Sequence, residues 1–237
     1  MSQKVLCTIC ARAGSKGVRN KNLRPIAGLE LIAYSIIQAQ NSGLFEHIII
    51  STDSDEIAKI AQKYDAEVFF KREAALSCDT AAKVPVMRDA FLRTEAHFGL
   101  KFDTLIDLDA TAPLRRSEDI KRAYALFKSG DYENLITGVR ARRNPYFNLV
   151  EAQMGGGFDT AKPCTFTRRQ DAPLCYDMNA SIYIFTRARL LARDDVFGEK
   201  TALYEMGEES AFDIDSGLDF EIVEFLLKRR GLKREEF

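Results

Sequence analysis

A short basic turn near the N-terminus carries the residue types best suited to chemistry. An apolar run from Val5 to Cys10, typical of a buried strand, leads directly into a segment with two glycines, Gly14 and Gly17. The serine and the cations of this segment are Arg12, Ser15, Lys16, Arg19, Lys21 and Arg24. Glycine lets the backbone approach a ligand closely, and backbone N–H groups beside mobile cations bind phosphate. The turn therefore predicts a phosphate-binding site, with a solvated basic loop as the alternative.

The spacing of these glycines excludes two common nucleotide-binding sequences. A Walker A loop has four residues between its first glycine and Gly-Lys-Ser/Thr, whereas only Ser15 and Lys16 separate Gly14 from Gly17. The dinucleotide fingerprint needs Gly-x-Gly-x-x-Gly, which the turn also lacks. The pattern predicts an anion site of another kind.

Two aspartates near the other end of the chain form a second candidate cluster. Asp213 and Asp215 are two positions apart, so in extended backbone both side chains lie on one side and can reach one cation. Mg²⁺ binds one or two carboxylates together with substrate phosphates and waters. Such a pair can instead cap a helix or face water, and Ser216 with Asp219 predicts a helix start there. Combined with the basic turn, the pair predicts that a triphosphate binds in one cleft between the cations of the turn and a metal ion held by the two aspartates.

The apolar pattern between these clusters predicts the elements that position them. Short β-branched runs alternate with stretches of helical periodicity. The expected strands are Val5–Cys10, His47–Thr52, Ala66–Phe70 and Thr104–Leu108, and the expected helices are Leu31–Gln40, Glu56–Tyr64 and Ala81–His97. This order predicts an α/β fold with a Rossmann-like, mostly parallel sheet and helices on both faces. Binding sites in such sheets lie at the carboxyl ends of the strands, where the turn and Asp109 fall.

The periodicity breaks down between residues 144 and 175. Prolines and the run Gly155-Gly156-Gly157 interrupt the segment, and the chain is expected to return to the sheet at Ser181 to Phe185. A plain loop of this length is uncommon in a compact domain, so we expect a small excursion that contacts a second subunit. Residues 1–237 are expected to form one domain, with 144–175 as a dimerisation and substrate arm.

Length and charge exclude several classes of protein. The chain has 237 residues and a net charge of −1, which does not suggest a nucleic-acid partner. Its first apolar run is too short for a signal peptide, and no stretch approaches the ~20 apolar residues of a membrane span. These features predict a cytoplasmic protein that does not bind membranes.

The cysteines and histidines predict structural roles. The five cysteines lack the spacing of a disulfide framework, which fits reduced thiols. Cys7 and Cys10 are three apart on a strand, so they should point to opposite faces and not chelate a metal together. His47 and His97 lie far apart at expected element boundaries, with no pattern of a ligand or a base.

Four separated segments resemble one enzyme family. The turn Ala11-Arg-Ala-Gly-Ser-Lys-Gly-Val18 resembles the N-terminal signature of the acylneuraminate cytidylyltransferases, which activate sialic acid and related nonulosonic acids as CMP-sugars. The other resembling segments are Lys71–Thr80, Arg168–Pro173 with Asn179–Tyr183, and Asp213–Asp219. The resemblance extends over nearly the whole chain and implies attack of the sugar's anomeric hydroxyl on the α-phosphorus of CTP, with release of pyrophosphate.

The resemblance also implies roles for individual residues. Lys21, Arg12 and Asp215 are the expected catalytic residues, with Lys21 on the α-phosphate. The residues expected to bind the nucleotide are Arg12, Ser15, Lys16, Lys21, Asn22, Arg72 and Ala81; those expected to bind the sugar are Asp109, Arg169 and Tyr183; and those expected to hold Mg²⁺ are Asp213 and Asp215. The implied partners are CTP and a nine-carbon 2-keto sugar acid, and the implied assembly is a homodimer.

Two departures from the family pattern bear on the sugar. Asp109 stands where the family commonly has a glutamine that recognises the sugar, and Phe147 stands where sialic acid enzymes tend to have a lysine. An anion at Asp109 would repel a substrate carboxylate unless it is neutralised; we expect either a metal ion there or a basic sugar substituent facing it. Both departures favour a diacetamido nonulosonic acid, such as legionaminic acid, over plain sialic acid.

Three other functions remain open. A nucleotidyltransferase for 3-deoxy-octulosonate or for a sugar 1-phosphate is the nearest alternative, although the octulosonate motif Gln-Gly-Asp-Glu-Pro is absent. A glycosyltransferase would also use Asp-x-Asp on an α/β fold. A non-catalytic nucleotide-binding subunit is the alternative from another class, disfavoured because the chain has both the cationic turn and the acidic pair.

Overall fold

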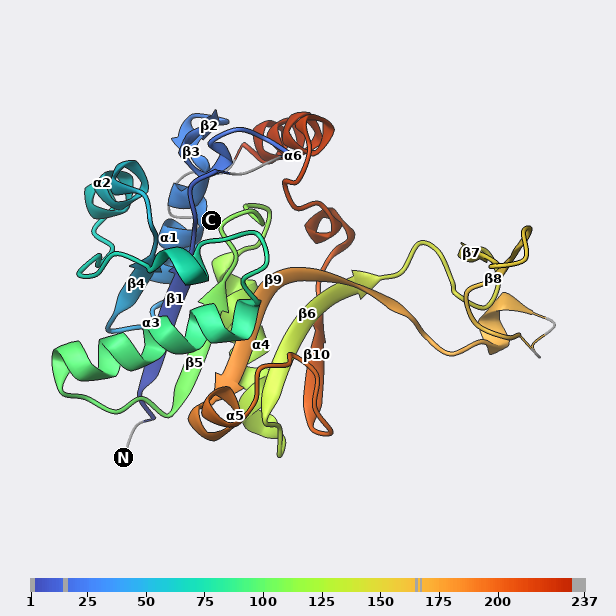
Figure 1. Ribbon diagram of the computed structural model, residues 1–237. Coiled ribbons are helices and arrows are strands. Elements are labelled where there is room, and N and C mark those ends of the chain that lie inside the picture. Colours follow the sequence, from blue (N-terminus) through green and yellow to red (C-terminus); the bar gives the residue numbers. More distant parts are fainter. Residues whose placement is uncertain (1–2, 15–16, 165, 167, 232–237) are drawn as a thin grey trace.

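A six-stranded sheet forms the centre of the computed structural model, which describes residues 3–14, 17–164, 166 and 168–231 (Figure 1). Its strands, in spatial order, are β10 (Thr201–Glu205), β6 (Asn134–Arg140), β9 (Tyr176–Thr186), β5 (Thr104–Leu108), β1 (Val5–Cys10) and β4 (Ile48–Ser51). β9 pairs antiparallel with β5 and β6, whereas β1 pairs parallel with β4 and β5, and β10 with β6. The expected mostly parallel sheet is confirmed.

Helices cover both faces of this sheet, as expected. The helices on one face are α1 (Leu31–Ser42), α2 (Asp55–Lys63) and α4 (Ser117–Ser129), and those on the other are α3 (Lys83–Phe98) and α5 (Arg187–Ala192). Local signals set their ends: Ser54 caps α2 through the backbone N–H of Ile57, and Gly43 ends α1 with a φ of 64°. Within the described ranges, no helix is both long and apolar enough to cross a membrane.

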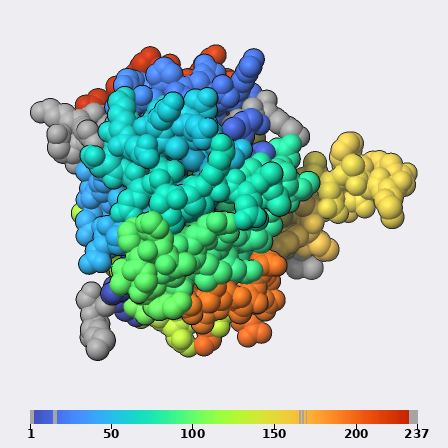
Figure 2. Space-filling model, turned by 60° about the vertical axis from the view of Figure 1, so that its left-hand side comes forward, coloured from blue at the N-terminus to red at the C-terminus, as the bar shows by residue number. Residues whose placement is uncertain are grey.

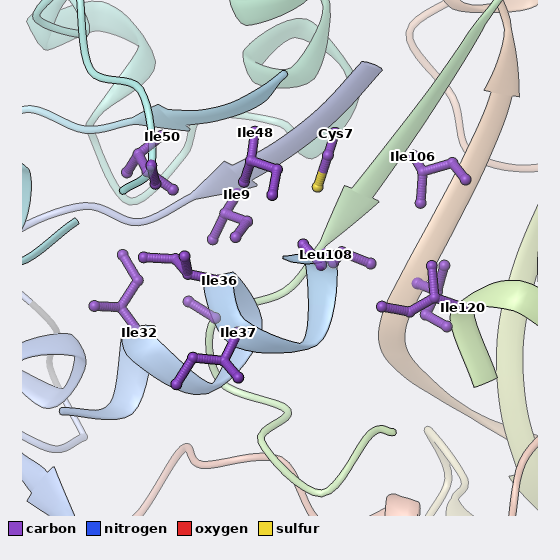
Figure 3. Packing of buried hydrophobic residues seen from close by; sticks show 14 of the residues in the cluster. Cys7, Ile9, Ile32, Ile36, Ile37, Ile48, Ile50, Ile106, Leu108 and Ile120 are labelled. Carbon is purple, nitrogen blue, oxygen red and sulfur yellow. The ribbon is translucent and has the colours of Figure 1, made fainter. Parts of the chain in front are cut away.

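Alternation along the strands divides the core into two layers. Cys7 and Ile9 of β1 point to the α1 side of the sheet in Figure 3, while Leu6 packs on the α3 face. Cys10 also packs on the α3 face, which confirms that the two cysteines of β1 point apart. Each buried isoleucine contributes about 1.5–3 kcal/mol, so these layers hold the strand ends that carry the polar side chains.

A third apolar cluster joins the two ends of the chain. It packs Val18 and Ile26 from the N-terminal region against Ile214 and Phe220, which flank the start of α6 (Gly217–Arg230). Ile26 belongs to the short pair β2 (Pro25–Ile26) and β3 (Leu29–Glu30), which lies beside α6 in Figure 1. A capping box between Ser216 and Asp219 starts the helix, as predicted. The cluster therefore brings the basic turn against the segment with Asp213 and Asp215.

After β6 the chain leaves the sheet and forms a projecting arm. It carries the hairpin β7 (Val150–Ala152) and β8 (Phe158–Thr160), which stands away from the body in Figures 1 and 2. The short 3₁₀ turn Arg169–Asp171 follows before β9 begins. The chain thus leaves the sheet in the segment where an excursion was expected, and Ser181 to Phe185 lies within the longer strand β9. The other 3₁₀ turns are Lys21–Leu23, Ala74–Leu76 and Glu208–Ala211.

The strand predicted at Ala66–Phe70 was wrong. Only Glu67 makes a bridge to Ile49 at the sheet edge. The two phenylalanines pack instead on the end of α3, where Phe69 stacks on His97 with ring centroids 4.0 Å apart. His47 stacks on Phe98 in the same region and contacts Glu67. Both histidines thus make structural contacts.

Candidate active site

A cavity of about 460 Å³ opens at the carboxyl ends of β1 and β5. This is the edge at which parallel α/β sheets place their ligands. The residues proposed from sequence that line it are Arg12, Lys21, Asn22, Arg72, Ala81, Asp109 and Asp215. Residues from four separate parts of the chain thus meet at one site: the basic turn, the segment before α3 with its first turn, the end of β5 and the segment before α6.

The basic turn and the acidic pair share this cavity. The ammonium of Lys21 donates to the Asp215 carboxylate at 2.9 Å and to the backbone carbonyl of Ile214 at 2.5 Å. Gly17 lies so close that a Cβ there would be 1.8 Å from the Asp215 carbonyl oxygen. The absence of a side chain at Gly17 is therefore what permits the contact.

Arg12 faces the cavity from the end of β1. Its guanidinium forms an ion pair with Asp79 at 2.5 Å and donates to the Ser77 carbonyl at 3.4 Å. Both partners lie in the loop before α3. Arg12 thus connects the basic turn to the loop that resembles the cytosine-binding segment. Ser15 and Lys16 lie outside the described residues.

Asn22 and Arg72 leave polar atoms in the cavity wall unpaired. Arg72 is only 5% exposed, and its Nε and Nη2 have no hydrogen-bond partner among the described residues. The side-chain oxygen of Asn22 is buried and unpaired in the same sense. Each such group lowers stability by about 1–3 kcal/mol, and a ligand that pairs with it recovers that energy. These atoms indicate a ligand with both donors and acceptors, as a nucleotide base has.

Asp213 is not among the described residues that line the cavity, but it is close enough to Asp215 and Asp109, which do line it, to feel their charges. Burial, with the nearby charges of Asp215 and Asp109, raises the pKa of Asp213. Two carboxylates that repel each other in this way fit a cation that arrives with a triphosphate, since Mg²⁺ needs only one or two protein carboxylates. The described residues contain no cluster of three or more His, Cys, Asp or Glu side chains that could hold a metal on its own.

A partly buried ionic cluster that was not predicted from the sequence forms the cavity floor. Lys83, in the first turn of α3, places its ammonium 2.8 Å from Asp107 and 3.2 Å from Asp109. Burial alone would lower the pKa of Lys83, but Asp107 and Asp109 outweigh it and raise that pKa well above its usual value. Thr8 and Cys10 donate to the other oxygen of Asp107. Lys83 was not predicted because it lies in a segment with helical periodicity. Asp107 and Asp109, on one face at the end of a strand, were the signal that a cation lies nearby.

Asp109 is ionised and compensated within the protein. Burial would raise its pKa, but Lys83 and the Thr111 N–H and hydroxyl lower it to about 2. Lys83 therefore supplies the neutralising charge that we had expected from a metal ion or a sugar substituent.

The two remaining sugar-binding candidates lie apart from each other. Tyr183 of β9 is 5% exposed, and its ring centroid lies 5.2 Å from the Lys83 ammonium. Burial raises the pKa of Tyr183 to about 12. Arg169 lies in the short 3₁₀ turn of the projecting arm.

Comparisons with known proteins agree with this geometry. A family model described as cytidylyltransferase matches residues 6–230. The CMP-N,N'-diacetyllegionaminic acid synthase of Campylobacter jejuni is 65% identical over 234 residues, and post-translational flagellin modification protein B of Campylobacter coli is 64% identical over 234 residues; each match covers 99% of both chains. N-acylneuraminate cytidylyltransferase A of Danio rerio is 32% identical over 97% of this chain and 52% of its own length.

A solved structure shares the fold. CMP:2-keto-3-deoxy-manno-octonic acid synthetase complexed with CTP matches with a TM-score of 0.70 at 15% identity, over 96% of this chain and 100% of that one. Identity this low supports the architecture alone. The full-length relatives and the family model carry the assignment, and they confirm the resemblance noted in the sequence: the chain belongs to the cytidylyltransferase family.

Proposed function

We propose that this enzyme couples CTP to the anomeric hydroxyl of a nonulosonic acid and releases pyrophosphate, with N,N'-diacetyllegionaminic acid as its preferred substrate. The observation that carries the proposal is the single cavity in which Lys21 meets Asp215 beside the unpaired donors of Arg72. The 65% identity to a synthase of that CMP-sugar supports the choice of acid.

The residues of the cavity would have different roles in such a transfer. Arg12 and Lys21 would hold the triphosphate, with Lys21 on the α-phosphate. Asn22, Arg72 and the backbone of Ala81 would read cytosine, which offers an amine donor and two acceptors. The bond from the anomeric oxygen to the α-phosphorus forms as the bond to the leaving pyrophosphate breaks, and in-line displacement of this kind depends on position and charge.

A divalent cation fits the acidic side of the cavity. Asp213 and Asp215 would hold it, and the burial and nearby negative charge that raise the pKa of Asp213 favour a cation there. Bound Mg²⁺ supplies charge neutralisation on the triphosphate. Lys21, already within 2.9 Å of Asp215, would keep that carboxylate oriented toward the nucleotide.

The arm supports a homodimer as the working assembly. It exposes apolar side chains to water, and a cluster of exposed apolar side chains is typical of a surface that contacts another protein. They are Leu149, Val150, Met154, Phe158, Phe166 and Leu174. In such a dimer, the arm of one subunit would bring its Arg169, the arginine expected to bind the sugar, toward the cavity of the other. We further propose a cytoplasmic location, where CTP is available and the five free cysteines stay reduced.

A substrate panel tests the proposal. Purified protein is mixed with CTP, Mg²⁺ and one acid at a time: N,N'-diacetyllegionaminic, N-acetylneuraminic, pseudaminic or 3-deoxy-octulosonic acid. Pyrophosphate release should show the highest kcat/KM for the first acid. A preference for 3-deoxy-octulosonic acid would favour the nearest alternative named from the sequence, and no release with any acid would favour a non-catalytic subunit.

A further inference from the structure

The ion pairs of Lys83 at the cavity floor have a use beyond balancing charge. We propose that Lys83 is a positioning residue for the sugar acid: it holds Asp109 so that one carboxylate lone pair faces the cavity and accepts a hydrogen bond from a hydroxyl or acylamino N–H of the sugar. The inference rests on the proposed function and adds a residue and a contact to it.

The geometry fixes Asp109 from three directions. Its Oδ1 accepts from the Thr111 backbone N–H at 3.0 Å and from the Thr111 hydroxyl at 2.9 Å, and its Oδ2 lies 3.2 Å from the Lys83 ammonium. A carboxylate has about four lone-pair sites, so these donors leave one acceptor site on Oδ2. Asp109 and Lys83 both line the cavity, with side chains 23% and 26% exposed. The remaining acceptor site is thus available to a ligand.

Stability does not explain the cluster. Replacing a buried ion pair by apolar residues of similar volume is often neutral or stabilising by about 1–4 kcal/mol. Asp107 is fully buried and already accepts from the Thr8 hydroxyl at 2.7 Å, so an uncharged polar side chain there would satisfy the same donor. An ionic cluster at the wall of a binding cavity is better explained by the ligand than by the fold.

The chemistry of the Asp109 carboxylate determines which group of the substrates can bind to it. The Asp109 oxygen that faces the cavity can only accept a hydrogen bond, so its partner must be a hydrogen-bond donor. The Lys83 ammonium also lies 5.2 Å from the ring centroid of Tyr183, the other candidate on the sugar side. A diacetamido sugar offers two N–H donors beside its hydroxyls, which matches a carboxylate in place of a neutral amide.

A double-mutant cycle with separate Michaelis constants tests the inference. The variants are Lys83→Gln, Asp109→Asn and the double variant, assayed by pyrophosphate release with CTP and N,N'-diacetyllegionaminic acid. Each single change should raise the KM for the sugar acid about tenfold and leave the KM for CTP within about twofold. The double variant should resemble Asp109→Asn alone, because Lys83 acts through that carboxylate.

Two further variants keep the test decisive. Lys200→Met is the matched control, since Lys200 pairs with Asp131 on the surface, and it should keep both constants. If Lys83→Gln does not fold, Lys83→Gln with Asp107→Asn removes both buried charges and should show the same rise in the sugar KM.

The outcomes separate this inference from the proposed function. A wild type that releases no pyrophosphate with any sugar acid defeats both. If the wild type is active, any of three results defeats the inference alone. Lys83→Gln keeps the wild-type KM for the acid, the KM for CTP rises instead, or the effects of the two substitutions on the KM for the acid multiply in the double variant.

Discussion

The ammonium of Lys21 lies 2.9 Å from the carboxylate of Asp215, although 194 positions separate them in the sequence. Asp215 is 77% exposed on its side chain, and an ion pair this open contributes only about 0–1 kcal/mol to stability. The contact therefore matters for what it brings together: the cationic turn and the acidic pair occupy one cavity.

Removal of the Lys21 ammonium should slow catalysis and leave the fold intact. Lys21→Ala should lower kcat at saturating CTP by roughly 100-fold, because an electrostatic group aimed at the reacting phosphate acts mainly in the transition state. Pyrophosphate release with full CTP titrations measures this. An unchanged rate at saturation would remove Lys21 from the α-phosphate.

A methyl group at Gly17 should separate the two clusters. Gly17→Ala places a Cβ 1.8 Å from the Asp215 carbonyl oxygen, so the backbone must move, which we expect to destabilise the protein by about 1–3 kcal/mol and to lower kcat/KM at least tenfold. Gly207→Ala is the matched control, because a Cβ there meets nothing within 4 Å. Equal activity and melting temperature in the two variants would show that the close approach is not needed.

Arg72 offers a test in which stability and binding move in opposite directions. Arg72→Met removes two unpaired buried donors, so the melting temperature should stay level or rise. The affinity for CTP should fall about tenfold or more, and the preference for CTP over UTP should shrink. Calorimetric titration with each nucleotide measures both effects. A variant that keeps its CTP affinity would show that the unpaired donors do not bind the base.

Acid stability should depend on a buried carboxylate far from the site. Burial would raise the pKa of Glu95, but Arg187, Lys101 and the Phe102 N–H outweigh it and lower that pKa from 4.5 to about 2. The unfolded chain therefore binds the proton first, so this contribution is full above pH 4.5 and disappears as the pH falls toward 2.

Urea unfolding across this pH range checks the assignment. Glu95→Gln should flatten the acid limb of the stability curve, whereas Glu118→Gln, on an exposed side chain, should leave it in place. Identical acid limbs in the wild type and Glu95→Gln would place the acid sensitivity elsewhere.

Local rules in the sequence predicted much of this fold. Helix ends follow the capping residues: α2 begins after Ser54, α6 begins after Ser216, and α1 ends at Gly43. The alternation along β1 places Cys7 and Cys10 on opposite faces. The strand predicted at Ala66–Phe70 was wrong because its aromatic rings found partners on α3, a tertiary preference that no local pattern contains.

The site was predictable only in part, for a related reason. The basic turn and the acidic pair each follow from local spacing, and the resemblance joined them. Lys83 was missed because its ion pairs with Asp107 and Asp109 depend on α3 crossing the end of β5. Arg72 was named through the resemblance alone, since its unpaired donors are visible only in three dimensions.

The most direct test of the central claim, that Asp215 holds a divalent cation on the triphosphate, measures how activity depends on magnesium in variants of Asp215 and of a control aspartate. Pyrophosphate release from CTP and N,N'-diacetyllegionaminic acid is measured for the wild type, for Asp215→Asn and for the control Asp131→Asn, whose side chain is exposed and pairs with Lys200. We predict magnesium-dependent turnover in the wild type and the control, and background release from a folded Asp215→Asn at every concentration. Turnover like that of the wild type in Asp215→Asn would contradict the account.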